Sequence, residues 1–188
     1  MLRLPTTAAL AILIAGPAVA ADAHRELGAH QHGHATLNIA FEGNTISMEL
    51  EAPGMDIVGF EHAASSEAER AAEAKAKALL TDPTQLFRLP AAAGCSLGSG
   101  KVVVESGHDH DHAADKKDAA PAAAGHTEFH AEYSFDCKAL ASVAGIEFPF
   151  FDKFPTTREI DVTVIGPKGQ TKFEVSRDKP RIALGGIM

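Results

Sequence analysis

Apolar residues alternate with polar or small ones in two pairs of neighbouring segments. Residues 37–41 and 46–50 each show this pattern, and Glu42-Gly43-Asn44 lies between them. Successive side chains of a strand point to opposite faces, so the pattern predicts a β-hairpin with one apolar face. Residues 158–165 and 171–177 predict a second hairpin, joined by a turn that contains glycine and proline.

The alanine-rich segment that follows the first hairpin favours a helix. It runs from Ser66 to Leu80, has Ser66 and Glu69 at capping-box spacing, and is stopped by an Asp-Pro pair. Residues 101–105 and 126–135 predict two more strands. The expected fold class is α+β, with antiparallel β-sheet and hairpins, one prominent Ala-rich helix and a disordered His-rich loop.

The N-terminal segment has the pattern of a secretory signal peptide. Arg3 precedes an apolar run over residues 7–15, and Ala18-Val19-Ala20 forms a small-x-small cleavage site. The run is shorter than the about 20 residues that a membrane span needs. We therefore expect residues 1–20 to be removed and residues 21–188 to form a single metal-binding domain in the periplasm, with a low-complexity insert at 107–125 and no membrane span.

The charge balance of the chain is acidic. It carries 17 Lys and Arg against 25 Asp and Glu, a formal charge of −8. Losing Arg3 with the signal segment leaves 16 basic side chains and a charge of −9. This balance argues against nucleic acid as a partner and favours the accumulation of cations.

Two cysteines, Cys95 and Cys137, lie on either side of the insert. In an oxidising compartment such a pair most often forms a disulfide, and closing a loop of roughly 40 residues contributes about 3–4 kcal/mol. We expect this bond to pin both ends of the loop to the folded body. A role as thiolate metal ligands is the alternative.

The ten histidines of the chain gather in short clusters beside acidic residues. Neutral imidazole and carboxylate are ligands for borderline divalent metals, so metal capture is the leading hypothesis, with Zn²⁺ as the ion and Cu²⁺ or Ni²⁺ as alternatives. The insert, with its alternating His and Asp, is predicted to collect metal in several geometries. The candidate ligands are His30, His32, His34, His62, His108, Asp109, His110, Asp111, His112, His126, Glu128 and His130.

The strand after the insert predicts an ordered site. Its aromatic residues fall on one face, and His126, Glu128, His130 and Glu132 fall on the other. Extending the parity of the first hairpin backwards puts His30, His32 and His34 on its polar face. We expect a neighbouring strand carrying these histidines to complete tetrahedral coordination.

Several of these segments together resemble the ZrgA-type proteins, a periplasmic family induced by zinc limitation in Gram-negative bacteria. The resemblance rests on Ala29–Ala35, Gly59-Phe60-Glu61-His62, the His/Asp-rich insert, the two cysteines and a late Phe-Pro segment. It implies zinc binding in support of zinc uptake, with His108, His110 and His112, followed by His30, His32 and His34, as ligands. We expect a zinc ABC transporter, or its solute-binding protein, as the receiving partner.

Other classes of function stay open beside this one. The chain has no Gly-x-Ser-x-Gly or His-Glu-x-x-His motif, which argues against an enzyme, although His₂Glu ligation would also suit a metallohydrolase. A non-catalytic periplasmic adaptor of a transporter is the second alternative. Cleavage after Ala21 would expose Asp22-Ala23-His24, which resembles an amino-terminal Cu²⁺/Ni²⁺ motif.

Overall fold

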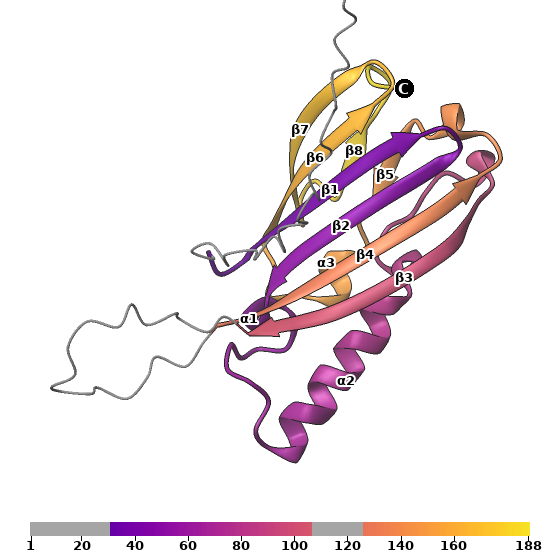
Figure 1. Cartoon of the computed structure of the whole chain (residues 1–188). Helices are drawn as coiled ribbons and strands as arrows, with labels where there is room; N and C mark the ends of the chain where they lie inside the picture. Colours follow the sequence, from indigo (N-terminus) through magenta and orange to yellow (C-terminus); the bar gives the residue numbers. More distant parts are fainter. Residues whose placement is uncertain (1–30, 107–125) are drawn as a thin grey trace, which may run out of the picture.

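The computed structural model describes residues 31–106 and 126–188, and a six-stranded sheet dominates it (Figure 1). The predicted signal peptide (residues 1–20), the following residues up to 30 and the insert (residues 107–125) lie outside the described part. The strands follow the order β3-β4-β2-β1-β6-β7 across the sheet. Their bounds are β1 His34–Glu42, β2 Thr45–Pro53, β3 Cys95–Ser106, β4 Thr127–Cys137, β6 Glu159–Gly166 and β7 Gly169–Ser176.

Both predicted hairpins are confirmed. β1 pairs with β2, placing Ile39 opposite Met48, and β6 pairs with β7, placing Val162 opposite Phe173. All neighbouring strands are antiparallel except β1 and β6, which run parallel. The sequence predicted only antiparallel pairing, because turn signals report pairing between consecutive strands and a parallel pair needs a long crossover.

One face of the sheet is buried beneath the remaining elements. The covering segments include the helix α2 (Glu67–Thr81) and the short two-stranded sheet of β5 (Gly145–Glu147) and β8 (Arg181–Ala183). Between them, the ring of Phe87 packs edge-on against Tyr133 and Phe148. The smaller elements are α1 Gly54–Ile57, α3 Phe150–Lys153, and the 3₁₀ turns η1 Pro83–Gln85, η2 Ala91–Ala93 and η3 Leu140–Ser142. The late Phe-rich segment belongs to this core: Phe148, Phe150, Phe151 and Phe154 are all buried.

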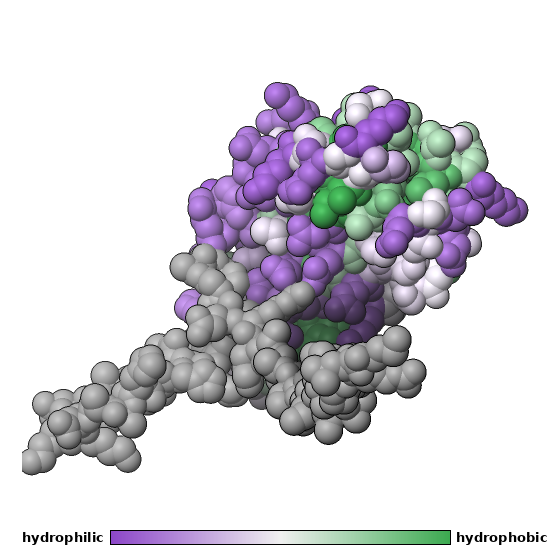
Figure 2. Space-filling view, turned by 45° about the horizontal axis from the view of Figure 1, so that its top comes forward, coloured by the Kyte–Doolittle hydropathy of each residue, from purple (hydrophilic) through white to green (hydrophobic). Residues whose placement is uncertain are grey.

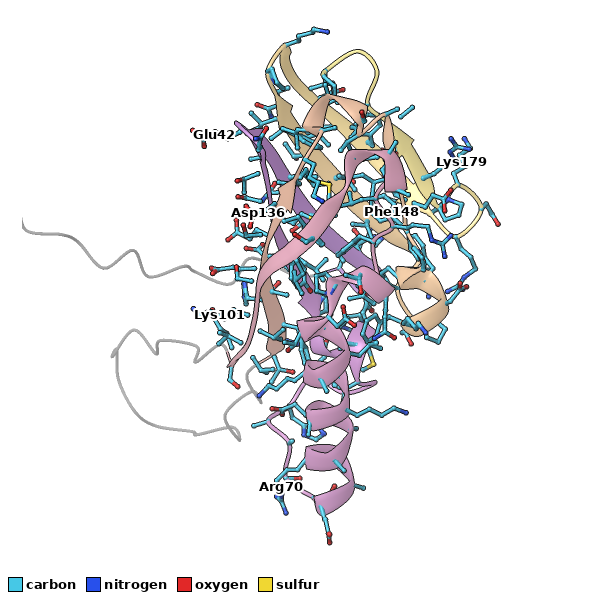
Figure 3. The ribbon with its side chains drawn as sticks, turned by 90° about the vertical axis from the view of Figure 1, so that its right-hand side faces the viewer. Glu42, Arg70, Lys101, Asp136, Phe148 and Lys179 are labelled. Atoms are coloured by element: carbon cyan, nitrogen blue, oxygen red, sulfur yellow. A yellow bond between two sulfur atoms is a disulfide. The ribbon has the colours of Figure 1, made fainter. Side chains whose placement is uncertain are left out.

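The other face of the sheet is open. In the edge-on view of Figure 3, Glu42, Lys101 and Asp136 project on the side opposite Phe148. Hydrophilic residues also cover most of the surface seen in Figure 2, around a smaller apolar area. Among the residues that the structure describes, no helix is both long and apolar enough to cross a membrane.

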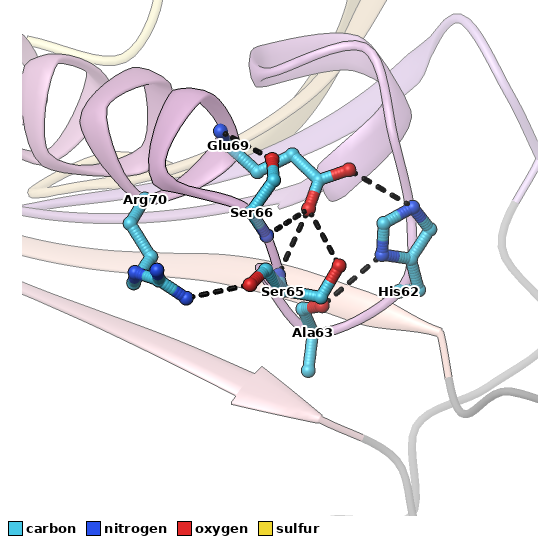
Figure 4. A network of polar contacts seen from close by, with 6 residues as sticks. All are labelled: His62, Ala63, Ser65, Ser66, Glu69 and Arg70. Carbon is cyan, nitrogen blue, oxygen red and sulfur yellow. Dashed lines mark hydrogen bonds and ion pairs between the residues drawn. The ribbon is translucent and has the colours of Figure 1, made fainter.

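The predicted capping box begins α2. The Ser66 hydroxyl accepts the Glu69 N–H, and the Glu69 carboxylate accepts the N–H groups of Ser65 and Ser66 at 2.8 and 2.9 Å (Figure 4). These hydrogen bonds lower the pKa of Glu69 to about 2. At its other end the helix lies close to β3. There a Cβ on Gly100 would lie 2.5 Å from the Thr81 carbonyl oxygen, so glycine permits the approach.

The disulfide between Cys95 and Cys137 is present, but it does not sit where the insert leaves the domain. The two cysteines face each other at one end of the β3–β4 pair, whereas the insert connects Ser106 to His126 at the other end. The expectation that the bond pins the base of the loop is therefore wrong. It fastens the far ends of the two strands instead.

Replacing both cysteines by serine should lower the free energy of unfolding by about 4 kcal/mol, because the disulfide closes a segment with a sequence separation of 42. Urea unfolding of the oxidised protein and the variant measures this difference. The oxidised protein treated with reductant is the control and should match the variant. Equal stability of all three would contradict the structural role.

Glu69→Gln should destabilise the protein near neutral pH, because the charged hydrogen bonds at the helix start are weakened. The contribution is complete above the unfolded pKa of about 4.5 and is lost as the pH falls to about 2. The difference in Tm from the parent should therefore shrink between pH 5 and pH 2. Glu67→Gln, in the same first turn, is the matched control and should show a smaller effect.

Candidate metal centre

The turn before β1 sets the position of His32. Gly33 has φ +87°, a left-handed conformation that favours glycine, and its N–H donates to Asp56 Oδ1 at 2.8 Å. Its carbonyl oxygen accepts the N–H groups of Arg158 and Glu159. The turn takes His32 off the strand. The prediction that the strand continues backwards with unbroken parity is therefore wrong at His32.

The segment from α1 to Glu61 packs against the start of β4. A Cβ on Gly54 would lie 2.2 Å from Thr127 Oγ1, so this close approach requires glycine. The Thr127 N–H then donates to the Glu61 carbonyl oxygen at 2.6 Å. These contacts place the Glu61 side chain beside His126.

Glu61 contacts two imidazoles that are far apart in sequence. Its Oε1 contacts His32 Nε2, and its Oε2 lies 2.7 Å from His126 Nδ1. The Glu61 side chain is 15% exposed, while those of His32 and His126 are 56% and 67% exposed. Two predicted ligands, His32 and His126, thus contact the same carboxylate. The carboxylate itself is largely shielded from solvent, and the two histidines are exposed. We refer to His32, Glu61 and His126 as the Glu61 centre.

Asp56 is buried and close enough to this centre for the charges of His32 and Glu61 to act on its carboxylate. Its Oδ2 atom has no hydrogen-bond partner in the part of the chain that the structure describes. Burial raises the pKa of Asp56, while the hydrogen bond from Gly33 and the charges of His32 and His34 act in the opposite direction. A buried carboxylate oxygen without a partner is a group that a nearby cation would stabilise.

His34 and His62 are directed elsewhere. His34 Nδ1 lies 3.5 Å from Glu159, and its Nε2 lies 3.0 Å from the Gln31 amide nitrogen. His62 turns toward the start of α2, with Nε2 3.6 Å from Glu69 (Figure 4). Neither contacts Glu61 in these arrangements, and their roles as ligands stay predictions.

Glu128 and His130 form a second group on the open face of the sheet. His130 Nε2 lies 2.9 Å from Glu128 and 3.6 Å from Glu105 of β3, and Nδ1 lies 3.6 Å from Glu51 of β2. The contact with Glu128 raises the pKa of His130, the charges of Glu105 and Glu51 act in the same direction, and burial opposes them. We call these four residues the His130 cluster.

The two groups correct the expected site. β2 lies between β1 and β4, so no strand carrying the early histidines is a direct neighbour of β4. His126 meets His32 only through Glu61, and Glu132 lies farther along the open face, opposite Lys101 and Glu49. Sequence reasoning did not select Asp56, Glu61, Glu51 or Glu105 as ligands. Within 31–106 and 126–188, no three His, Cys, Asp or Glu side chains already stand in metal-binding geometry. His30, His108, Asp109, His110, Asp111 and His112 lie outside the described residues.

Asp56→Ala should lower the free energy of unfolding by about 1–3 kcal/mol, because the buried Gly33 N–H loses its acceptor. Asp56→Asn keeps an oxygen at this position and should cost less. Urea unfolding in the presence of chelator compares the variants without metal. The assignment of Asp56 as the anchor of the turn fails if the alanine variant is the more stable of the two.

Comparison with known proteins identifies a family for this chain. A family model described as ZrgA family zinc uptake protein matches residues 29–184, which include both groups of side chains. A search of curated proteins finds no match. Because the family model covers most of the sequence, the chain belongs to the ZrgA family of zinc uptake proteins.

Proposed function

We propose that this chain is a periplasmic protein that captures Zn²⁺ at the Glu61 centre and supports its uptake. The observation that carries this proposal is the contact of one carboxylate with imidazoles from two distant segments. The family's role in zinc uptake supports the choice of ion. The role is one of binding rather than catalysis, and residues 1–20 would direct export.

The donor set suits zinc. Two imidazole nitrogens and a carboxylate are a common protein ligand set for Zn²⁺, and donors about 2.0 Å from a tetrahedral ion stand about 3.3 Å apart. The His126 Nδ1 to Glu61 Oε2 distance of 2.7 Å needs to open by about 0.6 Å to reach this spacing. The exposed histidines can make this adjustment, and the fourth position is left to Asp56 or water.

The exposure of the centre suits transfer. His32 and His126 are each more than half exposed, so a bound ion would be within reach of a receiving protein. A zinc ABC transporter or its solute-binding protein is the receiver that we propose. The insert ends at the residue before His126, so zinc held by His108, Asp109, His110, Asp111 and His112 would be at high effective concentration near the centre.

His32→Ala, Glu61→Gln and His126→Ala should each weaken Zn²⁺ affinity by at least about 10–100-fold, a loss seen even for outer-shell partners. Titration of the full mature chain against a competing chelator measures the affinity. A variant with His108, His110 and His112 replaced by alanine should lose weak binding and keep the tight site.

His62→Ala is the matched control, because this histidine adjoins Glu61 in sequence but contacts Glu69. It should bind zinc as the parent does. A loss in this variant together with parental affinity in His32→Ala would move the site to the start of α2 and contradict the proposal.

A further inference from the structure

His130 is a buried imidazole without a regular hydrogen bond. The residue is 8% exposed, and neither ring nitrogen has a hydrogen-bond partner among the described residues, although Nε2 lies 2.9 Å from Glu128. Buried polar groups normally make well-aligned hydrogen bonds, so a buried imidazole that meets three carboxylates without one needs an explanation. A cation between the nitrogen and the carboxylates supplies one.

The two distances from Nε2 to Glu128 and Glu105 bracket the spacing that such an ion would need. The distances of 2.9 Å to Glu128 and 3.6 Å to Glu105 lie on either side of the about 3.3 Å that separates donors around tetrahedral zinc. Glu105 and Glu128 are also direct cross-strand partners of β3 and β4. Like charges in such a pair repel each other, and a divalent cation between them would remove this repulsion.

The other ring nitrogen faces a carboxylate of the kind that orients metal-binding histidines. Nδ1 lies 3.6 Å from Glu51 Oε1, and Glu51 is the cross-strand partner of His130 in the β2–β4 pair. The Thr36 hydroxyl donates to the other oxygen of Glu51. With an ion on Nε2, the Glu51 carboxylate would accept the proton of Nδ1 and fix the ring, as in most protein zinc sites.

We propose that the His130 cluster is a second Zn²⁺ site, with His130 Nε2, Glu105 and Glu128 as ligands and Glu51 as the positioning residue. His130 and Glu128 are buried, whereas the Glu105 side chain is 44% exposed and can rotate to close the site. The cluster shares no residue with the Glu61 centre. His130 lies four positions after His126, about 13 Å along an extended strand.

Testing the second site requires a background variant in which the Glu61 centre and the histidines of the insert no longer bind zinc. The full chain carrying His32→Ala, Glu61→Gln and alanine at His108, His110 and His112 should retain one zinc equivalent in a chelator-competition titration. In long-range ¹H–¹⁵N spectra, added zinc should shift the His130 Nε2 resonance. Adding Glu105→Gln should weaken this binding by at least about 10-fold, and Glu51→Gln by about 10–100-fold.

Glu132→Gln is the matched control, because this residue lies on the same face of β4 but pairs with Lys101. It should leave the residual binding unchanged, and circular dichroism checks that each variant is folded. No residual binding in the background, or residual binding that Glu105→Gln does not alter, would overturn the second site. Neither outcome bears on the Glu61 centre, which is tested in the otherwise unaltered chain.

Discussion

The strict alternation of side chains along the long strands places apolar side chains on the face of the sheet that packs in the core. The other face carries the acidic and imidazole side chains. On β4, Phe129, Ala131 and Tyr133 are buried against the covering layer, so Glu128 and His130 must point to the opposite face. The covering elements pack on one side only (Figure 3). The acidic and imidazole side chains therefore collect on the open face and at the strand ends without disturbing the apolar core.

Two hydrogen bonds to the backbone position the residues of the Glu61 centre. The Gly33 N–H is held by Asp56, and the Glu61 carbonyl is held by the Thr127 N–H. Both hydrogen bonds tie the segment after β2 to another part of the chain, one before β1 and one at the start of β4. Glu61 is brought between two histidines by these contacts, so the centre depends on tertiary structure that no single segment contains.

The sequence predicted the features that depend on neighbouring residues. The two hairpins and the helix with its Ser66 cap follow from local alternation, spacing or composition. It also selected His32, His126, Glu128 and His130 as metal-type side chains. It could not group them correctly, because the grouping depends on strand order and on the turn at Gly33. Glu51 and Glu105 were overlooked for the same reason, since outward-facing glutamates of a strand are common and only the register brings these two to His130.

The two proposed sites differ in ways that suit different tasks. The Glu61 centre has two imidazoles that are more than half exposed, which permits a bound ion to exchange with a partner. The His130 cluster has one buried imidazole among carboxylates from three adjacent strands, so an ion there would link β2, β4 and β3. Closed sites of this kind stabilise folds, while open ones keep a position for exchange. Zinc at the His130 cluster would therefore hold in place the strand that positions His126 for capture.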